Sequence, residues 1–102
     1  MHVGLVRFEA HIPESRSLKE KRAVVKPIVE RIRHRYSLSV AEIDYQDKWQ
    51  RCAVGLAVVA ESRRHAADVV NAVERYVWSR PGIEVSAFET RWSTWEDGED
   101  GS

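Results

Sequence analysis

Hydrophobic residues recur at every second position along two segments of the chain, residues 2–12 and 51–60, and this is the period of a β-strand. A third segment, residues 38–45, is rich in β-branched and aromatic residues but alternates imperfectly, as an edge strand or a bulged strand would. Residues 83–92 follow the helix-stopping sequence Arg-Pro-Gly and supply a last strand. The pattern therefore predicts four strands.

Two other segments carry hydrophobic residues at the three- and four-residue spacing of an α-helix. The first opens with Ser17 and Glu20, which can satisfy each other's free backbone N–H groups, and it runs to Tyr36. The second begins at the N-cap candidate Ser62 and ends at the Arg-Pro-Gly sequence. Pro27 lies inside the first helix but points away from its hydrophobic stripe, so we expect one kinked helix, the alternative being two shorter ones.

The order of these elements is strand, helix, strand, strand, helix, strand. Two strand-helix-strand units joined by a hairpin suggest an α+β, ferredoxin-like fold, with a four-stranded antiparallel sheet and both helices on one face. Right-handed crossovers place the first and third strands at the centre of the sheet. We expect a single domain over residues 1–95, followed by an acidic, disordered tail over residues 96–102.

The composition is that of an ordinary globular protein, with 43% hydrophobic and 31% charged residues among 102. Cys52 is the only cysteine, which excludes an intramolecular disulfide, and its apolar neighbours favour a buried position over a reactive thiol. The first strand begins within three residues of the N-terminus, and we find no leader segment and no hydrophobic segment of membrane-spanning length. We therefore expect a cytoplasmic protein with no membrane partner.

The net charge is zero, but the two signs are unevenly placed: residues 1–40 hold nine Lys and Arg against four Asp and Glu. Four of these basic residues fall on one side of the first helix, within about 60° of arc, and only Glu30 interrupts them. Arg16 and Lys21 add to the positive charge at the start of that helix. Such a ridge can contact a phosphate backbone, although charged ridges are often merely solvated. The candidate phosphate contacts are Arg16, Lys19, Arg22, Lys26, Arg33 and Arg51.

The face of the sheet opposite the helices is predicted to be smooth and partly apolar. No outward position on the two central strands is aromatic, so we do not expect the base stacking used by RNA-recognition-motif domains. A flat apolar face more often packs against a second copy of the chain, or against Trp92 and Trp95 folding back. A homodimer could use this face or the exposed edge strand. The candidate interface residues on the face are Val3, Leu5, Ala53, Ala57 and Val59.

Two further tryptophans are expected to be partly exposed. Trp49 lies in a polar hairpin that contains no glycine, and Trp78 lies on the outer side of the second helix. Both are candidate contact anchors, the alternative being that each covers an edge of its own fold.

Catalytic chemistry finds little support in the sequence. The four histidines lack metal-ligand spacing, Asp44 and Asp47 are an isolated carboxylate pair, and no serine or cysteine lies in a nucleophile elbow. We expect a protein that is not an enzyme and has no catalytic residues, no metal and no cofactor.

Two segments, Glu14-Ser15-Arg16-Ser17-Leu18-Lys19-Glu20-Lys21-Arg22 and Asp44-Tyr45-Gln46-Asp47-Lys48-Trp49-Gln50-Arg51, resemble the YlxP-like family of small bacterial proteins. The resemblance covers roughly residues 1–92, and the residues after Trp92 depart from it. It implies a ferredoxin-like cytoplasmic protein whose biochemical function is not established. Because members are often encoded among translation and ribosome-maturation factors, it also implies a role near RNA, by association rather than mechanism.

These observations lead to a first hypothesis of a non-enzymatic binding module that docks on RNA or a ribosomal particle through its basic ridge. The alternative is a homodimeric protein-interaction module that buries its open sheet face. A small-ligand sensor is a third reading, which rests on analogy of fold alone.

Overall fold

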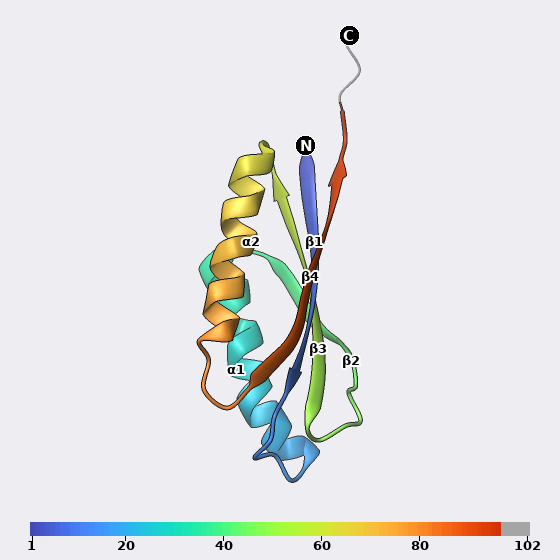
Figure 1. Ribbon diagram of the computed structural model, residues 1–102, viewed down its shortest axis with the longest axis vertical. Coiled ribbons are helices and arrows are strands. Elements are labelled where there is room, and N and C mark those ends of the chain that lie inside the picture. The colour runs from blue at the N-terminus through green and yellow to red at the C-terminus, as the bar shows by residue number, and fades with distance from the viewer. Residues whose placement is uncertain (97–102) are drawn as a thin grey trace.

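The computed structural model describes residues 1–96, which contain two helices and four strands (Figure 1). In chain order the elements are β1 (His2–His11), α1 (Leu18–Tyr36), β2 (Ser39–Asp44), β3 (Arg51–Ala60), α2 (Arg63–Trp78) and β4 (Glu84–Thr94). This order confirms the predicted fold class, and every element begins and ends within two residues of its expected position. The predicted tail over residues 96–102 lies outside the described residues, apart from the exposed Glu96.

The strands form one antiparallel sheet in the order β2-β3-β1-β4. Strands β1 and β3 are therefore central, as right-handed crossovers require, and β2 and β4 are the two edges. Both helices lie on one side of the sheet, so no helix of residues 1–96 covers the other side (Figure 1). The molecule thus presents a helical face, an open sheet face and two strand edges.

Helix α1 is continuous through Pro27, which is exposed on its outer side. At its start the Ser17 hydroxyl accepts a hydrogen bond from the Glu20 N–H at 3.1 Å. The Glu20 carboxylate accepts from the Arg16 N–H at 2.9 Å, one residue earlier than the expected Ser17 N–H. The predicted hydrogen bond to the Ser17 hydroxyl therefore forms, whereas the Glu20 carboxylate bonds to a different N–H from the one predicted. No helix within residues 1–96 combines the length and the hydrophobicity that crossing a membrane needs.

The hydrophobic core fills the space between the helices and the sheet. Phe8 is 1% exposed and stacks on Phe88 with 6.0 Å between the ring centroids, and Ile32 and Val73 bring both helices into the same core. Cys52 is buried here as predicted, and its burial raises the pKa of the thiol to about 11. At neutral pH the thiol is protonated and acts as a small hydrophobic group.

Trp92 lies on the helical face, not on the open face. It stands opposite Gly4 on β1, and a Cβ added to Gly4 would come within 3.0 Å of the indole. The Arg63 guanidinium covers the outer side of the same ring at 4.0 Å from its centroid. The idea that Trp92 folds back over the open face is therefore wrong, because β4 continues to Thr94 and strand alternation fixes the side on which Trp92 points.

Lys21 is almost fully buried, with 1% of its side chain exposed. Its ammonium group donates hydrogen bonds to the Glu42 carboxylate at 2.9 Å, the Tyr45 carbonyl at 2.8 Å and the Arg51 carbonyl at 3.3 Å. Position 21 lies on the same side of α1 as the buried Val25, so Lys21 is not one of the surface cations that the sequence suggested. Three acceptors satisfy its three N–H donors, which makes burial of the charge tolerable. Lys21 thus fastens the start of α1 to the hairpin between β2 and β3.

The substitution Lys21→Met removes this cation and leaves the Glu42 carboxylate and two carbonyls without their donor. We expect it to lower the free energy of unfolding by about 3 kcal/mol, measured by urea denaturation at neutral pH. Lys26→Met, at an exposed position of the same helix, is the matched control and should change that free energy by less than about 0.5 kcal/mol. Equal stabilities of the two variants would contradict the role given to Lys21.

Candidate interaction surfaces

Lys19, Arg22 and Lys26 form an exposed row along the first half of α1, which we call the basic ridge. They extend over two turns, or about 10 Å of helix axis. The ion pairs formed within residues 1–96 involve none of the three. The ridge therefore presents three cations whose charge is not offset by a contacting carboxylate.

Arg33, predicted to extend this row, is engaged within the fold. Its guanidinium pairs with the Glu30 carboxylate and donates a hydrogen bond to the Val40 carbonyl at 2.8 Å. These contacts tie the second half of α1 to the edge strand β2. Arg16, by contrast, is exposed, and it lies before the N-cap Ser17, outside the helix that carries the ridge.

Arg51, another predicted phosphate contact, lies on the open sheet face and so does not join the ridge. It pairs with Glu9 at 3.1 Å, and its guanidinium stacks over the Tyr45 ring at 3.9 Å from the centroid. Glu9 also pairs with Arg7 at 2.6 Å, and Arg7 reaches Asp44 at 3.8 Å. The hydrogen bond from Arg7, followed by that from Arg51, lowers the pKa of Glu9. We call these five residues the charged cluster.

The sequence did not indicate the position of Tyr45 in this cluster. Tyr45 has a φ of 59°, in the left-handed region that glycine usually occupies. The one signal in the sequence was that the hairpin contains no glycine. A residue other than glycine then has to adopt the left-handed conformation that the turn requires. Hydrogen bonds to the Tyr45 carbonyl from Lys21 and from the Lys48 N–H at 2.9 Å hold this conformation.

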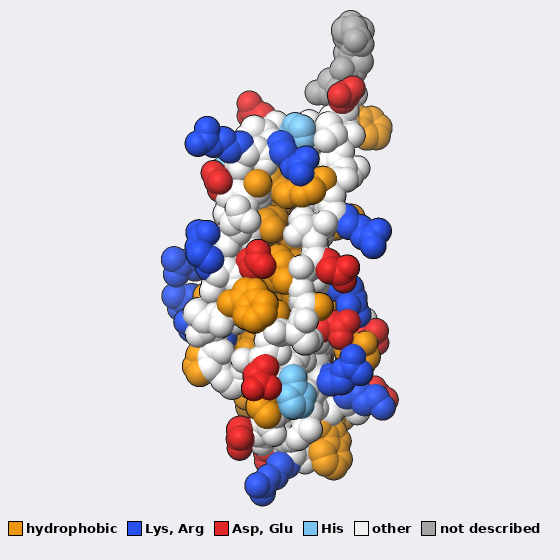
Figure 2. Space-filling model, in the orientation of Figure 1, with side chains coloured by type: hydrophobic (Ala, Val, Ile, Leu, Met, Phe, Trp, Pro, Cys, Tyr) orange, Lys and Arg blue, Asp and Glu red, His pale blue; other side chains and the backbone are white. Residues whose placement is uncertain are grey.

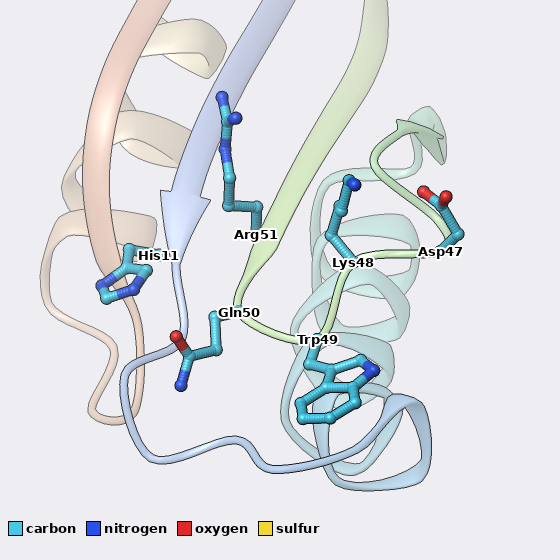
Figure 3. Close-up of a pocket in the computed structure, with 6 residues that line it drawn as sticks. All are labelled: His11, Asp47, Lys48, Trp49, Gln50 and Arg51. Atoms are coloured by element: carbon cyan, nitrogen blue, oxygen red, sulfur yellow. The ribbon is translucent and has the colours of Figure 1, made fainter.

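A shallow depression of about 490 Å³ lies beside the hairpin, lined by His11, Asp47, Lys48, Trp49, Gln50 and Arg51 (Figure 3). Gln50 is fixed by hydrogen bonds to the carbonyls of Pro13 at 3.2 Å and Ser15 at 3.0 Å. The side chains of Arg51 and Trp49 point in opposite directions along the depression, and the lining groups do not converge on one point (Figure 3). Residues 1–96 also contain no group of three potential metal ligands. The depression therefore offers a contact surface and not an arrangement for acid–base or metal chemistry.

The open face gathers most of the exposed large hydrophobic side chains. Of seven such side chains among residues 1–96, five lie on this face by strand alternation. They are Met1, Leu5, Ile43, Val59 and Trp95, exposed by 51%, 51%, 49%, 64% and 66%. A groove of about 430 Å³ runs between β1, β3 and β2 on the same face.

The predicted residues of this face contribute unequally. Leu5 and Val59 are exposed, Val3 and Ala57 are half-buried, and Ala53 is fully buried. Ile43 was missed because residues 38–45 alternate imperfectly, and the register of β2 does shift between Glu42 and Asp44. Ile43 covers Gly55, whose added Cβ would lie 3.1 Å from its side chain.

Trp49 and Trp78, exposed by 55% and 56%, lie outside the open face. Trp49 stands on the hairpin, and Trp78 stands in the last turn of α2. Both are exposed as predicted, but the structure does not join them into one surface.

A comparison with solved structures shows that the chain has a ferredoxin fold. A de novo designed protein with a ferredoxin fold, solved by solution NMR, superposes with a TM-score of 0.53 at 14% identity, over 100% of this chain and 93% of the designed one. The chain belongs to the family described as a protein of unknown function (DUF503), whose model matches residues 3–90. The uncharacterized protein YlxP of Bacillus subtilis (strain 168) is 39% identical over 90 residues, which is 88% of this chain and 98% of YlxP. The resemblance drawn from the sequence is confirmed.

The charged cluster predicts how the ionisation of Glu9 responds to substitution. We expect Arg7→Ala to raise the pKa of Glu9 toward its ordinary value and Arg51→Ala to raise it less, because the Arg7 hydrogen bond is the larger cause of the lowering. The measurement is an NMR titration of the Glu9 carboxyl carbon. Since the folded state depresses this pKa, the cluster stabilises the protein above the pKa of the unfolded chain and loses that contribution as the pH falls through the folded value. An unchanged Glu9 pKa in Arg7→Ala would exclude the Arg7–Glu9 bond in solution.

Proposed function

We propose that this protein is a non-enzymatic RNA-binding module that contacts RNA phosphates through the basic ridge. The observation that carries the proposal is the row of three uncompensated cations on α1, in a protein whose formal net charge is zero. In such a protein, attraction to a polyanion has to come from a local concentration of positive charge.

The helix sets the spacing of the contacts. Lys19, Arg22 and Lys26 stand on one side of a continuous helix, so they can face successive phosphates of a backbone without rearrangement. Arg16 is exposed just before the N-cap of the helix and adds positive charge near the start of the row. Arg33 contributes less, because Glu30 and Val40 already occupy its guanidinium, and Arg51 serves the opposite face of the sheet.

Contacts of this kind read shape and charge, not sequence. Phosphate contacts release counterions, so the affinity should fall steeply as salt rises, whereas sequence specificity requires base contacts. The open face of the central strands has no outward aromatic side chain, which favours structured RNA recognised by its backbone over single strands read by stacking.

The triple substitution Lys19→Glu, Arg22→Glu and Lys26→Glu should abolish binding to a fluorescein-labelled RNA hairpin in a fluorescence anisotropy titration. For the unmodified protein we expect a logarithmic slope of affinity against salt of about −2 to −3, as three phosphate contacts imply. The control is Arg31→Glu, Arg64→Glu and Arg75→Glu, which changes the net charge equally at exposed positions outside the ridge. Equal losses in both triple variants, or no binding by the unmodified protein at low salt, would reject the proposal.

The open face favours a second candidate function, the docking of another protein. Five exposed large hydrophobic side chains lie on this one face. Exposed apolar patches of this kind commonly mark contact sites for other proteins. This surface and the basic ridge lie on different sides of the molecule, so the two functions are compatible.

Leu5→Lys with Val59→Lys tests the second function at two positions that are more than half exposed, so the core stays intact. In a pull-down of the tagged protein from bacterial lysate, washed at stepped salt, we expect a salt-resistant protein to be lost with this variant and kept with the ridge variant. RNA should be kept with this variant and lost with the ridge variant. A captured protein that survives Leu5→Lys with Val59→Lys would exclude the open face as its docking site.

A further inference from the structure

Strand β4 forms one edge of the sheet within residues 1–96, and a register shift between Val85 and Ala87 interrupts its pairing with β1 only near its start. It is eleven residues long, almost twice the length of the other edge strand β2, and contains no proline, glycine or lysine. Its register against β1 is regular from Ala87 to Thr94. Long regular edges present unpaired backbone groups that readily accept another strand.

The hydrogen bonds at one end of the β1–β4 ladder show which groups of the edge are free. Met1 and Trp95 exchange both backbone bonds, at 2.8 Å and 3.0 Å. In an antiparallel pair such bonded positions alternate, so Arg91 and Glu89 also bond inward to β1. The residues between them, Thr90 and its alternate neighbours Phe88 and Trp92, direct their N–H and C=O groups outward.

We propose that a second copy of this chain pairs its own β4 with this edge, antiparallel, about a two-fold axis that passes between the two Thr90 residues. In this register Thr90 exchanges both backbone bonds with Thr90 of the second copy. Phe88 and Trp92 form the next bonded pairs across the interface. Glu89 of each copy then stands directly opposite Arg91 of the other, where side chains approach most closely.

Charge selects this register over its neighbours. Centring the pairing on Glu89 would set two like carboxylates opposite each other, and centring it on Arg91 would do the same with two guanidinium groups. Centring it on Thr90 instead creates two opposite-charge pairs, related by the symmetry axis. On the helical face, the register centred on Thr90 also brings Phe88 of each copy against Trp92 of the other. Both side chains are only half-buried in the single chain.

The surroundings of the edge suit a second copy. Figure 2 looks onto this side of the molecule and shows hydrophobic side chains gathered between α2 and β4, where an added strand and its helix would cover them. The paired sheets would keep all four helices on one face and join the two open faces into one surface. Both basic ridges stay accessible, since α1 packs toward β2 at the far edge of each sheet. The pairing therefore goes beyond the proposed RNA contact and does not depend on it.

Sedimentation equilibrium with charge-swapped variants tests the pairing. The unmodified protein should approach twice its 11.8 kDa mass at high micromolar concentration. Glu89→Arg alone or Arg91→Glu alone should weaken association at least roughly tenfold, because each replaces two attractive pairs by two repulsive ones. The double variant should restore it. A monomer throughout the concentration range, or a double variant as weak as the single ones, would overturn the proposal.

A cysteine cross-link tests the position of the axis without reversing any charge. Thr90→Cys should form an intermolecular disulfide under mild oxidation, because paired residues on neighbouring strands lie within bridging distance. Thr94→Cys is the control, since the two copies of residue 94 would lie about 26 Å apart. Equal cross-linking at both positions would refute the register. A dimer that Leu5→Lys with Val59→Lys breaks, and that the Glu89 and Arg91 variants leave intact, would place the interface on the open face and refute the edge pairing.

Discussion

One buried ammonium group holds the start of helix α1 against the hairpin between β2 and β3. Lys21 reaches from the first turns of α1 to three acceptors, the Glu42 carboxylate and the carbonyls of Tyr45 and Arg51. These acceptors belong to the end of β2, the hairpin and the start of β3, so a single side chain sets how the hairpin sits against the helix. The left-handed conformation of Tyr45, with its carbonyl held by Lys21, brings the phenol ring beneath Arg51. A charge hidden behind the sheet therefore organises the charged cluster on its open face.

The positively charged residues separate into two groups once their contacts are known. Lys21, Arg33 and Arg51 hold parts of the fold together, through Glu42, the β2 edge and Glu9. Lys19 and Lys26 have no such contact within residues 1–96 and remain available for a ligand. Composition and helical spacing count all basic residues alike, although a cation already paired within the fold contributes little to binding an outside anion. The candidate RNA surface is consequently narrower than the run of basic residues in the sequence suggests.

Much of the fold could be predicted because local rules decide it. The alternation of β1 and β3, the Ser17 and Ser62 caps and the exposed position of Pro27 depend on neighbours close in the chain. The predicted helix start failed in one detail, since Glu20 bonds to the Arg16 N–H. The open-face position of Ile43 was missed because residues 38–45 alternate imperfectly in the sequence, and the register of β2 shifts between Glu42 and Asp44. The side of the sheet that Trp92 covers was misjudged because the length of β4 was underestimated.

The sequence by itself determined the order of the elements, the antiparallel sheet with central β1 and β3, and the membership of a family whose function is not established. Periodicity and capping act over a few residues, and right-handed crossovers leave one arrangement of such units. Only the tertiary structure decided that Lys21 is buried, that Arg33 is occupied and that Arg51 and Tyr45 meet on the open face. Lys21 and Arg33 find acceptors that lie 7 to 30 residues away along the chain, and Tyr45 meets Arg51 through a strained turn. Contacts of these two kinds produce no periodic pattern in the sequence.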